Sequence, residues 1–203
     1  MTTEDQIKKL REIANSALEM IEQLSLAPPP TEVTKRKICG GARIPPDFKA
    51  SVLWIEQELG LDADNLMACM AFETGLEFKA STRNPASSAS GLIQFMRATA
   101  LRLGTTIEKM RRMTEVEQLN YVYKYFAAFG KDLSHWKLAD TYMAILLPVM
   151  IGKDLDDEMK WSQAAYRVNK GLDLDRDGVI TKAEAASKVQ NMYDLGMKEE
   201  NMG

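Results

Sequence analysis

One glutamate stands where a carboxyl group could serve as a proton donor. Glu73 lies among large apolar side chains in the segment Met-Ala-Phe-Glu-Thr-Gly, just before Gly75, which is expected to end a helix. A helix C-terminus and loss of solvent both disfavour an ionised carboxylate and therefore raise its pKa. The segment predicts a protonated glutamate suited to general-acid catalysis. It also fits a solvent-facing glutamate at a frayed helix end, and the other polar segments favour the catalytic interpretation.

A twelve-residue segment near the C-terminus matches the calcium-binding loop of an EF-hand at each diagnostic position. Three aspartates at loop positions one, three and five would converge on one hard cation, and Gly178 permits the sharp turn. The position-seven residue would offer its backbone carbonyl, and the position-twelve glutamate would bind through both oxygens. The expected Ca²⁺ ligands are Asp173, Asp175, Asp177, Val179 and Glu184.

The chain contains one such loop, whereas EF-hand sensors work through a pair of helices that opens around the loop. The residues Asn169-Lys-Gly171 are expected to break the incoming helix just before the loop. We therefore expect a single stabilising site, not a calcium sensor.

Two further segments carry polar side chains suited to hold a substrate. The segment Gly-Leu-Ile-Gln-Phe, which begins at Gly91, is expected to start a helix after the small residues that end at Ser90. This would place the amide of Gln94 near the wall of a cleft. The segment Ala-Ala-Tyr-Arg-Val-Asn-Lys-Gly adds the phenol of Tyr166 and the amide of Asn169. We predict that Ser90, Gln94, Tyr166 and Asn169 bind substrate.

In this order, the segments around Glu73, Gln94 and Tyr166 resemble the soluble lytic transglycosylase family, with its Glu-Ser/Thr, Gly-Leu-Met-Gln and Ala-Tyr-Asn segments. The resemblance covers roughly residues 46–190, and an EF-hand-like loop after the last segment is similar to phage-encoded members. It implies a lysozyme-like helical domain. It also implies an enzyme, a lytic transglycosylase or muramidase, that cleaves the β-1,4 bond between N-acetylmuramic acid and N-acetylglucosamine in bacterial peptidoglycan during phage lysis.

By this resemblance, Glu73 protonates the glycosidic oxygen and then acts as a base, while Gln94 and Tyr166 hold the substrate and the acid. The chain departs from the family pattern at two points. Thr74 replaces the commoner serine, and Asn169 lies three residues after Tyr166 instead of next to it.

Most glycosidases use two carboxylates, and a second is not obvious here. Glu77 lies beyond the Gly75 break, and the acids of the loop are committed to calcium. A single-acid mechanism assisted by the substrate's own acetamido and 6-hydroxyl groups would leave a 1,6-anhydro end. Alternatively, Ser90 or Thr99 would orient a water for hydrolysis.

Helical periodicity runs through the chain from Pro45 onward, and no strand pattern competes with it. Four glycines stand where helices are expected to end: Gly60, Gly75, Gly104 and Gly130. Asp62 or Asp64 is expected to cap one helix, and capping boxes begin at Thr105 and Thr114. The sequence therefore predicts an all-α fold.

Three regions are expected. Residues 1–45 would form an amphipathic helix over Thr3–Leu24 and a tether that contains Pro28, Pro29 and Pro30. Residues 46–172 would form the catalytic domain. Residues 173–203 would form the calcium loop and a C-terminal helix packed on that domain. A monomer is expected, with dimerisation through the N-terminal helix as the alternative.

Composition excludes several classes of protein. The net charge of −3 gives no basic footprint for nucleic acid. The longest apolar stretch, Tyr142 to Gly152, is interrupted by Pro148 and is shorter than the roughly 18 to 20 residues of a membrane span. Cys39 and Cys69 belong to no cysteine motif, so two reduced, partly buried thiols are expected.

The N-terminus has no pattern of a secretory signal. The protein is therefore expected in the host bacterial cytoplasm before release to the cell wall, as an endolysin, or else as a virion component. Two other functions fit the sequence: a non-catalytic wall-binding or virion-structural module stabilised by calcium, and a calcium-dependent regulator.

Overall fold

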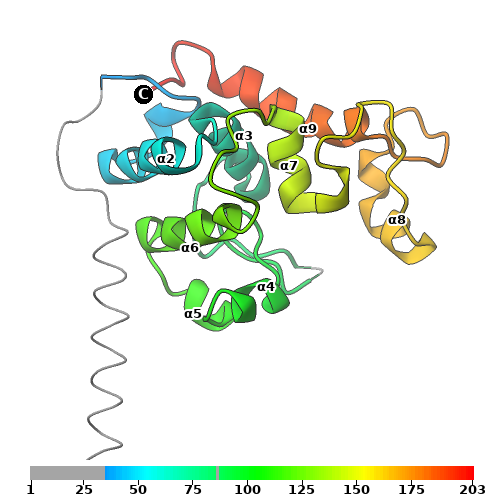
Figure 1. The fold of residues 1–203 in the computed structure, drawn as a ribbon, viewed down its shortest axis with the longest axis horizontal. Helices are drawn as coiled ribbons and strands as arrows, with labels where there is room; N and C mark the ends of the chain where they lie inside the picture. Colours follow the sequence, from blue (N-terminus) through cyan, green and yellow to red (C-terminus); the bar gives the residue numbers. More distant parts are fainter. Residues whose placement is uncertain (1–34, 86) are drawn as a thin grey trace, which may run out of the picture. The chain divides into compact units, whose positions relative to one another are not determined.

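A computed structural model describes residues 35–85 and 87–203 of the chain. The chain divides between residues 32 and 33, and the described residues belong to the second unit. The helix predicted at Thr3–Leu24 and the three consecutive prolines lie outside the described residues. The helices are α2 (Pro46–Leu59), α3 (Ala63–Thr74), α4 (Arg97–Arg102), α5 (Ile107–Met110), α6 (Glu115–Ala127), α7 (Leu138–Leu146), α8 (Gln163–Asn169) and α9 (Lys182–Gly196) (Figure 1).

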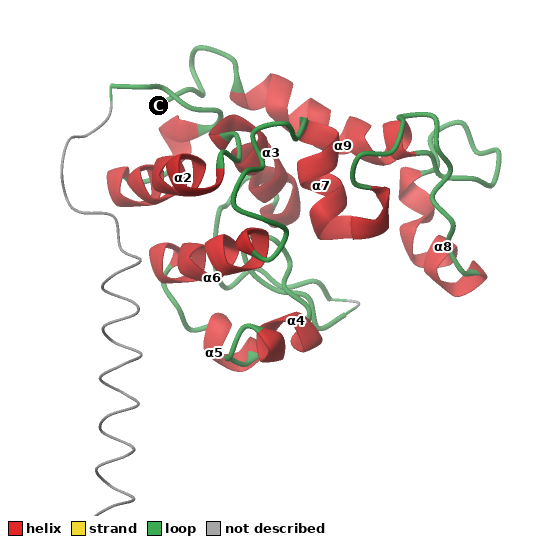
Figure 2. Ribbon diagram, viewed as in Figure 1, coloured by secondary structure: helices red, strands yellow, loops and turns green. Residues whose placement is uncertain are grey.

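The all-α prediction is confirmed for this part of the chain (Figure 2). Three short 3₁₀ turns join the helices: η1 (Gly41–Arg43), η2 (Pro148–Met150) and η3 (Lys170–Leu172). The strand-like pairings within the described residues are isolated bridges, which link Arg83 to Ser90, Ser90 to Phe95 and Glu158 to Thr181.

Polar side chains begin several of the helices as expected. Asp62 caps α3 by accepting a hydrogen bond from the backbone N–H of Asn65, and Thr114 forms a capping box with Glu117 at the start of α6. The capping box predicted at Thr105 is wrong. Thr106 caps α5 instead, because Thr105 is buried and its hydroxyl contacts no hydrogen-bond partner in the described chain.

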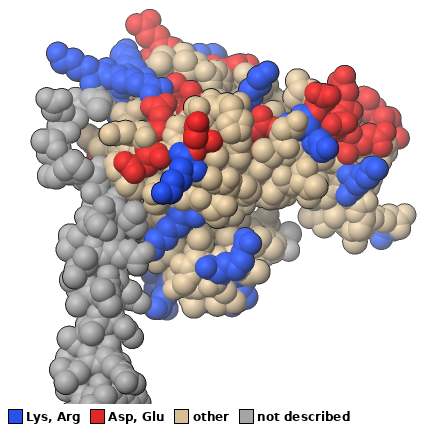
Figure 3. All heavy atoms as spheres, in the orientation of Figure 1, with Lys and Arg blue, Asp and Glu red and all other residues tan. Residues whose placement is uncertain are grey.

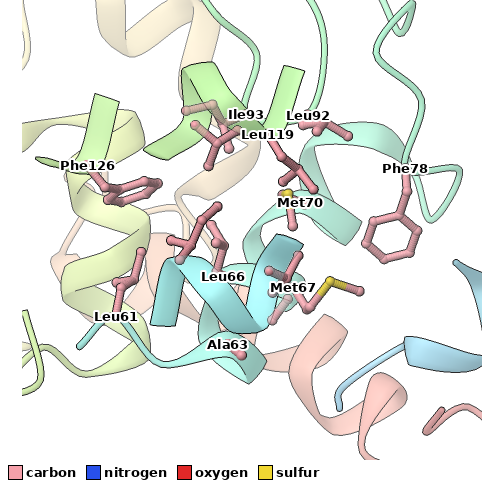
Figure 4. Packing of buried hydrophobic residues seen from close by; sticks show 14 of the residues in the cluster. Leu61, Ala63, Leu66, Met67, Met70, Phe78, Leu92, Ile93, Leu119 and Phe126 are labelled. Atoms are coloured by element: carbon pink, nitrogen blue, oxygen red, sulfur yellow. The ribbon is translucent and has the colours of Figure 1, made fainter. Parts of the chain in front are cut away.

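Helix α3 packs against α2, α7 and α9. One side of α3 contributes to a core that also contains Leu92 and Ile93 from the loop before α4 and Leu119 and Phe126 from α6. Figure 4 shows these side chains packed around Leu66 and Met70 of α3. The apolar face of α6, formed by Leu119, Val122 and Phe126, is therefore structural, and it fixes the loop before α4 relative to α3.

The other side of α3 contributes Cys69 to a second core with α7 and α9. This core includes Tyr142 and Met143 of α7 and Val189 of α9, and Phe72 and Tyr166 pack on it. Helix α9 runs alongside both α3 and α7 (Figure 1). The C-terminal helix α9 therefore packs against the two helices that carry Glu73 and Tyr142.

Part of the segment predicted as a tether up to residue 45 is packed into the folded domain. Ile38 and Cys39 are fully buried. The backbone N–H of Ile38 donates to the carbonyl of Gly203 at 2.9 Å, and Cys39 N–H donates to the carboxylate of Asp64 at 2.7 Å. The C-terminus lies beside this segment in Figure 1. The apolar residues at 38 and 39 therefore belong to the folded body and not to a linker.

Both cysteines are buried free thiols, as predicted. Among the described helices, none has the length and apolar character needed to cross a membrane.

Candidate functional site

Glu73 occupies the last turn of α3, and Gly75 ends the helix in the left-handed conformation at φ 61°. Its carboxyl group contacts no hydrogen-bond or ion-pair partner within residues 35–85 and 87–203. Loss of solvent at this position raises the pKa of Glu73 from 4.5 to about 7. A raised pKa was expected from the sequence, and desolvation is the cause the structure gives. At neutral pH the group is divided between its acid and base forms.

A buried tyrosine that the sequence interpretation treated only as core lies near this carboxyl group. Burial raises the pKa of Tyr142 on α7, and the nearby charge of Glu73 raises it further. The ring of Tyr142 packs edge-on against Phe72, with centroids 5.6 Å apart. The pKa of the Cys69 thiol is raised by burial and by the same glutamate. A signal for Tyr142 existed: a phenol within an apolar run usually has a polar neighbour.

The hydroxyl of Thr74, the residue after Glu73, forms two hydrogen bonds that hold the end of α3. It is buried, its hydroxyl donates to the carbonyl of Met70 at 2.6 Å, and it accepts from the N–H of Phe78 at 3.0 Å. These two bonds fasten the turn that leaves α3 to the end of the helix. A serine has the same donor and acceptor, so the threonine preserves this geometry.

Non-glycine residues with left-handed φ angles gather at the predicted chemical segments. In the described chain they are Leu76 (φ 71°) and Phe78 (φ 51°) after Glu73, Gln94 (φ 50°), and Arg176 (φ 66°). Arg176 belongs to the predicted calcium loop, residues 173–184, which is called the acidic loop below. Such conformations cost roughly 1–3 kcal/mol each and cluster at functional sites. The strain therefore falls in three of the four segments that the sequence selected, and none of it in the segment of Tyr166 and Asn169.

The segment that contains Gln94 is a closed turn, and the helix predicted there is wrong. Ser90 and Phe95 exchange two backbone hydrogen bonds, at 3.1 and 2.8 Å, so residues 91–94 form a loop and α4 begins only at Arg97. Gly91 at φ +84° permits this path. The Gln94 amide donates back to the carbonyl of Gly91 at 3.1 Å. Gln94 is partly buried, and no hydrogen bond joins its side chain to Glu73 in the described structure.

A fully buried amide from α6 holds this turn in place. The Gln118 side chain accepts from the N–H of Leu92 at 2.7 Å and donates to the carbonyls of Ala80 and Met110 at 3.2 and 3.0 Å. A Cβ atom at Gly91 would collide with this amide. Sequence reasoning missed Gln118, although it lies four residues before a core valine on the apolar stripe of α6.

Ser90 is fully buried, and its hydroxyl accepts from the guanidinium of Arg111 at 2.7 Å. The same guanidinium donates to the carbonyl of Ser88 at 3.2 Å. In this conformation Ser90 therefore ties the loop to the end of α5. A contact between Ser90 and substrate would require this loop to open.

The two residues of α8 that were predicted to bind substrate form hydrogen bonds with nearby residues of the chain. The Tyr166 hydroxyl donates to Asp173 at 2.5 Å, and the Asn169 amide donates to the carbonyl of Ala165 at 3.0 Å. The bond to Asp173 raises the pKa of Tyr166. Tyr166 thus joins α8 to the acidic loop, and its predicted contact with substrate stays a prediction.

The aspartates of the loop form a group that could hold a metal ion. Ligand oxygens of Asp173, Asp175 and Asp177 lie within 4.8 Å of one another. Gly178 adopts φ 93° at the predicted turn, and the N–H of Val179 donates to Asp177 at 2.8 Å. The donor set of clustered carboxylates suits a hard cation such as Ca²⁺. Figure 3 shows acidic side chains gathered at the end of the molecule where this loop lies.

Glu184 reaches back across the loop. One carboxylate oxygen accepts from the N–H of Leu174 at 2.9 Å, and the other accepts from Thr181 in the capping box of α9. These bonds lower the pKa of Glu184, chiefly through the backbone N–H of Thr181. The predicted break before the loop is present, because α8 ends at Asn169 and a 3₁₀ turn follows.

Hydrogen bonds also connect the acidic loop and the start of α9 to the segment before α8 and to α7. Met159 N–H donates to the carbonyl of Ile180 at 2.8 Å, so a segment before α8 pairs with the loop. Lys182 is almost fully buried, and its ammonium group donates to Asp140 on α7 and to the carbonyl of Lys153, both at 2.7 Å. Asp140 precedes Tyr142 on the same helix. The acidic loop and the surroundings of Glu73 therefore share α7.

No protein-family model matches the chain, and no curated protein matches it.

Proposed function

We propose that the protein is a peptidoglycan-cleaving glycosidase, a lytic transglycosylase or muramidase, with Glu73 as its catalytic acid. The observation that carries this proposal is a desolvated carboxyl group that has a pKa of about 7 and no hydrogen-bond or ion-pair partner among the described residues. A general acid is most effective when its pKa lies near the working pH. The ordered resemblance of three segments to the soluble lytic transglycosylases supplies the substrate class.

In the proposed reaction, Glu73 gives its proton to the glycosidic oxygen as the bond from the muramic-acid anomeric carbon to that oxygen breaks. The N-acetylglucosamine unit leaves with its 4-hydroxyl restored. The resulting carboxylate then removes a proton from the attacking hydroxyl, either the 6-hydroxyl of the same sugar or a water. This returns Glu73 to its acid form.

Tyr142 and the backbone turn around Thr74 position the acid in this proposal. The apolar wall formed by Phe72 and Tyr142 keeps the carboxyl group desolvated. The strained turn after α3, fixed by the hydroxyl of Thr74, sets where Glu73 points. We also propose that Ca²⁺ binds the 173–184 loop and stabilises α8 and α9.

Loss of turbidity in outer-membrane-permeabilised bacteria tests this function. Wild type is expected to clear the suspension and Glu73→Gln to leave it turbid. Glu77→Gln is the matched control, because it makes the same substitution at an exposed position four residues away. Equal clearing by wild type and Glu73→Gln would refute the role of the acid.

A non-catalytic wall-binding or virion-structural module is the second candidate. It is favoured by the contacts of Tyr166 and Gln94, which bond to Asp173 and Gly91 and not to Glu73. In that case wild type would bind purified cell walls and leave the suspension turbid.

A further inference from the structure

The part of the chain that contains α4 and α5 differs in charge from the rest of the protein. Residues 88–112 carry five basic side chains and one acidic side chain, a net charge of +4, whereas the rest of the chain carries −7. Figure 3 shows basic side chains gathered over the part of the molecule where Figure 1 places α4 and α5. The overall charge of −3 is thus unevenly distributed, and residues 88–112 form a basic lobe.

The exposed face of α4 combines basic and apolar side chains. Arg97 and Leu101 lie four residues apart, as do Ala98 and Arg102, so each pair lies side by side on the helix. All four residues are exposed, and so is Met96, which precedes the first turn. Leu101 has 61% of its surface exposed and Met96 has 48%. Among the described residues, two large apolar side chains thus lie in solvent beside arginines.

Most of the basic charge on the lobe is not neutralised within the described chain. Arg97 forms an ion pair with Glu108 at 2.9 Å, which joins α4 to α5. Arg102, Lys109 and Arg112 are exposed and form no ion pair with another described residue. Like charges repel one another, so an anionic partner at this surface would be favourable.

Hydrogen bonds to one short segment hold the lobe in shape. The backbone N–H of Arg97 donates to the hydroxyl of Ser88 at 3.3 Å. The guanidinium of Arg111 donates to the hydroxyl of Ser90 at 2.7 Å and to the carbonyl of Ser88 at 3.2 Å. Helix α4 also packs against α5. The exposed side chains therefore lie on a preformed surface, which lowers the cost of ordering on binding.

We propose that the basic lobe binds the surface of a lipid bilayer that contains anionic phospholipids. Each unpaired basic side chain at such a surface strengthens binding roughly fivefold. Met96 and Leu101 enter the boundary between the headgroups and the acyl chains, where their apolar surface leaves water. Non-specific binding to nucleic acid would use the charges alone, so the exposed apolar side chains favour a lipid surface. The proposal does not rest on the proposed function, because Glu73 lies outside the lobe.

Sedimentation of the full-length protein with sucrose-loaded vesicles measures this binding. The probe is a vesicle of phosphatidylglycerol and phosphatidylcholine in equal parts, and the comparison is a vesicle of phosphatidylcholine alone. Wild type should bind the anionic vesicles at low salt and bind the neutral ones far more weakly. Added NaCl should release the protein, because salt screens charges at the surface. Glu73→Gln should bind as wild type does.

Variants of the lobe separate the two contributions to binding. Removing two unpaired charges in Arg102→Gln, Lys109→Gln should weaken binding to the anionic vesicles roughly 25-fold. The matched control Lys131→Gln, Lys198→Gln removes the same charge at exposed positions outside the lobe and should change binding by less than about twofold. Leu101→Ser keeps every charge, changes a side chain that is mostly exposed, and should weaken binding severalfold.

Equal binding of wild type to anionic and neutral vesicles would overturn the proposal. Equal losses in the lobe variant and in the matched control would also overturn it, because attraction would then come from charge anywhere on the protein. If Leu101→Ser binds anionic vesicles as wild type does, and wild type binds duplex DNA more tightly than it binds the vesicles, the partner is a nucleic acid and the lipid assignment is wrong. Circular dichroism of each variant confirms that a loss of binding is not a loss of fold.

Discussion

Replacing Glu73 by glutamine should make the protein more stable at high pH while it removes activity. Glutamine has the shape of a protonated glutamate and cannot ionise. The folded protein holds the carboxyl group where loss of solvent raises its pKa from 4.5 to about 7. Wild type must therefore ionise a desolvated group when the pH rises, and the variant does not.

The size of this effect follows from the pKa difference. Below about pH 4.5 the carboxyl group is protonated in both the folded and unfolded states, so it contributes no difference. Between pH 4.5 and 7 the unfolded chain ionises first, and the free energy of unfolding of wild type falls. Above pH 7 the loss is complete, at about 3 kcal/mol from about 1.4 kcal/mol for each pKa unit. Glu73→Gln should match wild type at pH 4 and exceed it by up to this amount at pH 8.

Urea denaturation followed by circular dichroism at several pH values measures this difference. Subtracting the wild-type curve from that of the variant removes the contributions of all other titrating groups. Glu77→Gln, which makes the same change at an exposed position, controls for net charge. A stability difference between Glu73→Gln and wild type that does not change with pH would refute the assignment of a desolvated carboxyl group.

Three other changes test the parts that support the site. EGTA should lower the melting temperature of wild type but not that of the double variant Asp173→Ala, Asp175→Ala; an unchanged wild-type curve would remove the metal from the account. Lys182→Met should lower the free energy of unfolding by about 2–3 kcal/mol, because the partly buried Asp140 and the carbonyl of Lys153 would both lose the ammonium donor; a loss below about 1 kcal/mol in urea denaturation would contradict this. Gln118→Leu should cost about 2 kcal/mol or more, because the N–H of Leu92 and the carbonyl of Ala80 would lose their hydrogen-bond partner, and normal stability would show that the 91–94 turn is held by other contacts.

The sequence predicted features that depend on local chemistry. The stop at Gly75, the cap at Asp62 and the capping box at Thr114 follow from backbone groups within a few residues. The raised pKa of Glu73 could be anticipated because its neighbours in the segment are apolar. The aspartates at 173, 175 and 177 come together because loop spacing alone sets their positions.

Features that depend on distant contacts were missed or wrong. The turn at 91–94 reads as a helix start in sequence, and only its pairing with Phe95 and its bonds to Gln118 make it a loop. Ile38 belongs to the core because it meets the C-terminal residue, far away in the chain. The bond from Tyr166 to Asp173 joins residues seven positions apart and was not predicted from the motif. The phenol near Glu73 comes from Tyr142.

The most direct test of the central claim is mass spectrometry of purified peptidoglycan after incubation with the protein. Wild type should release fragments cut at the bond between N-acetylmuramic acid and N-acetylglucosamine, with either 1,6-anhydro or reducing ends, and Glu73→Gln should release none. Intact glycan strands after incubation with wild type, or the same fragments from both proteins, would contradict the account.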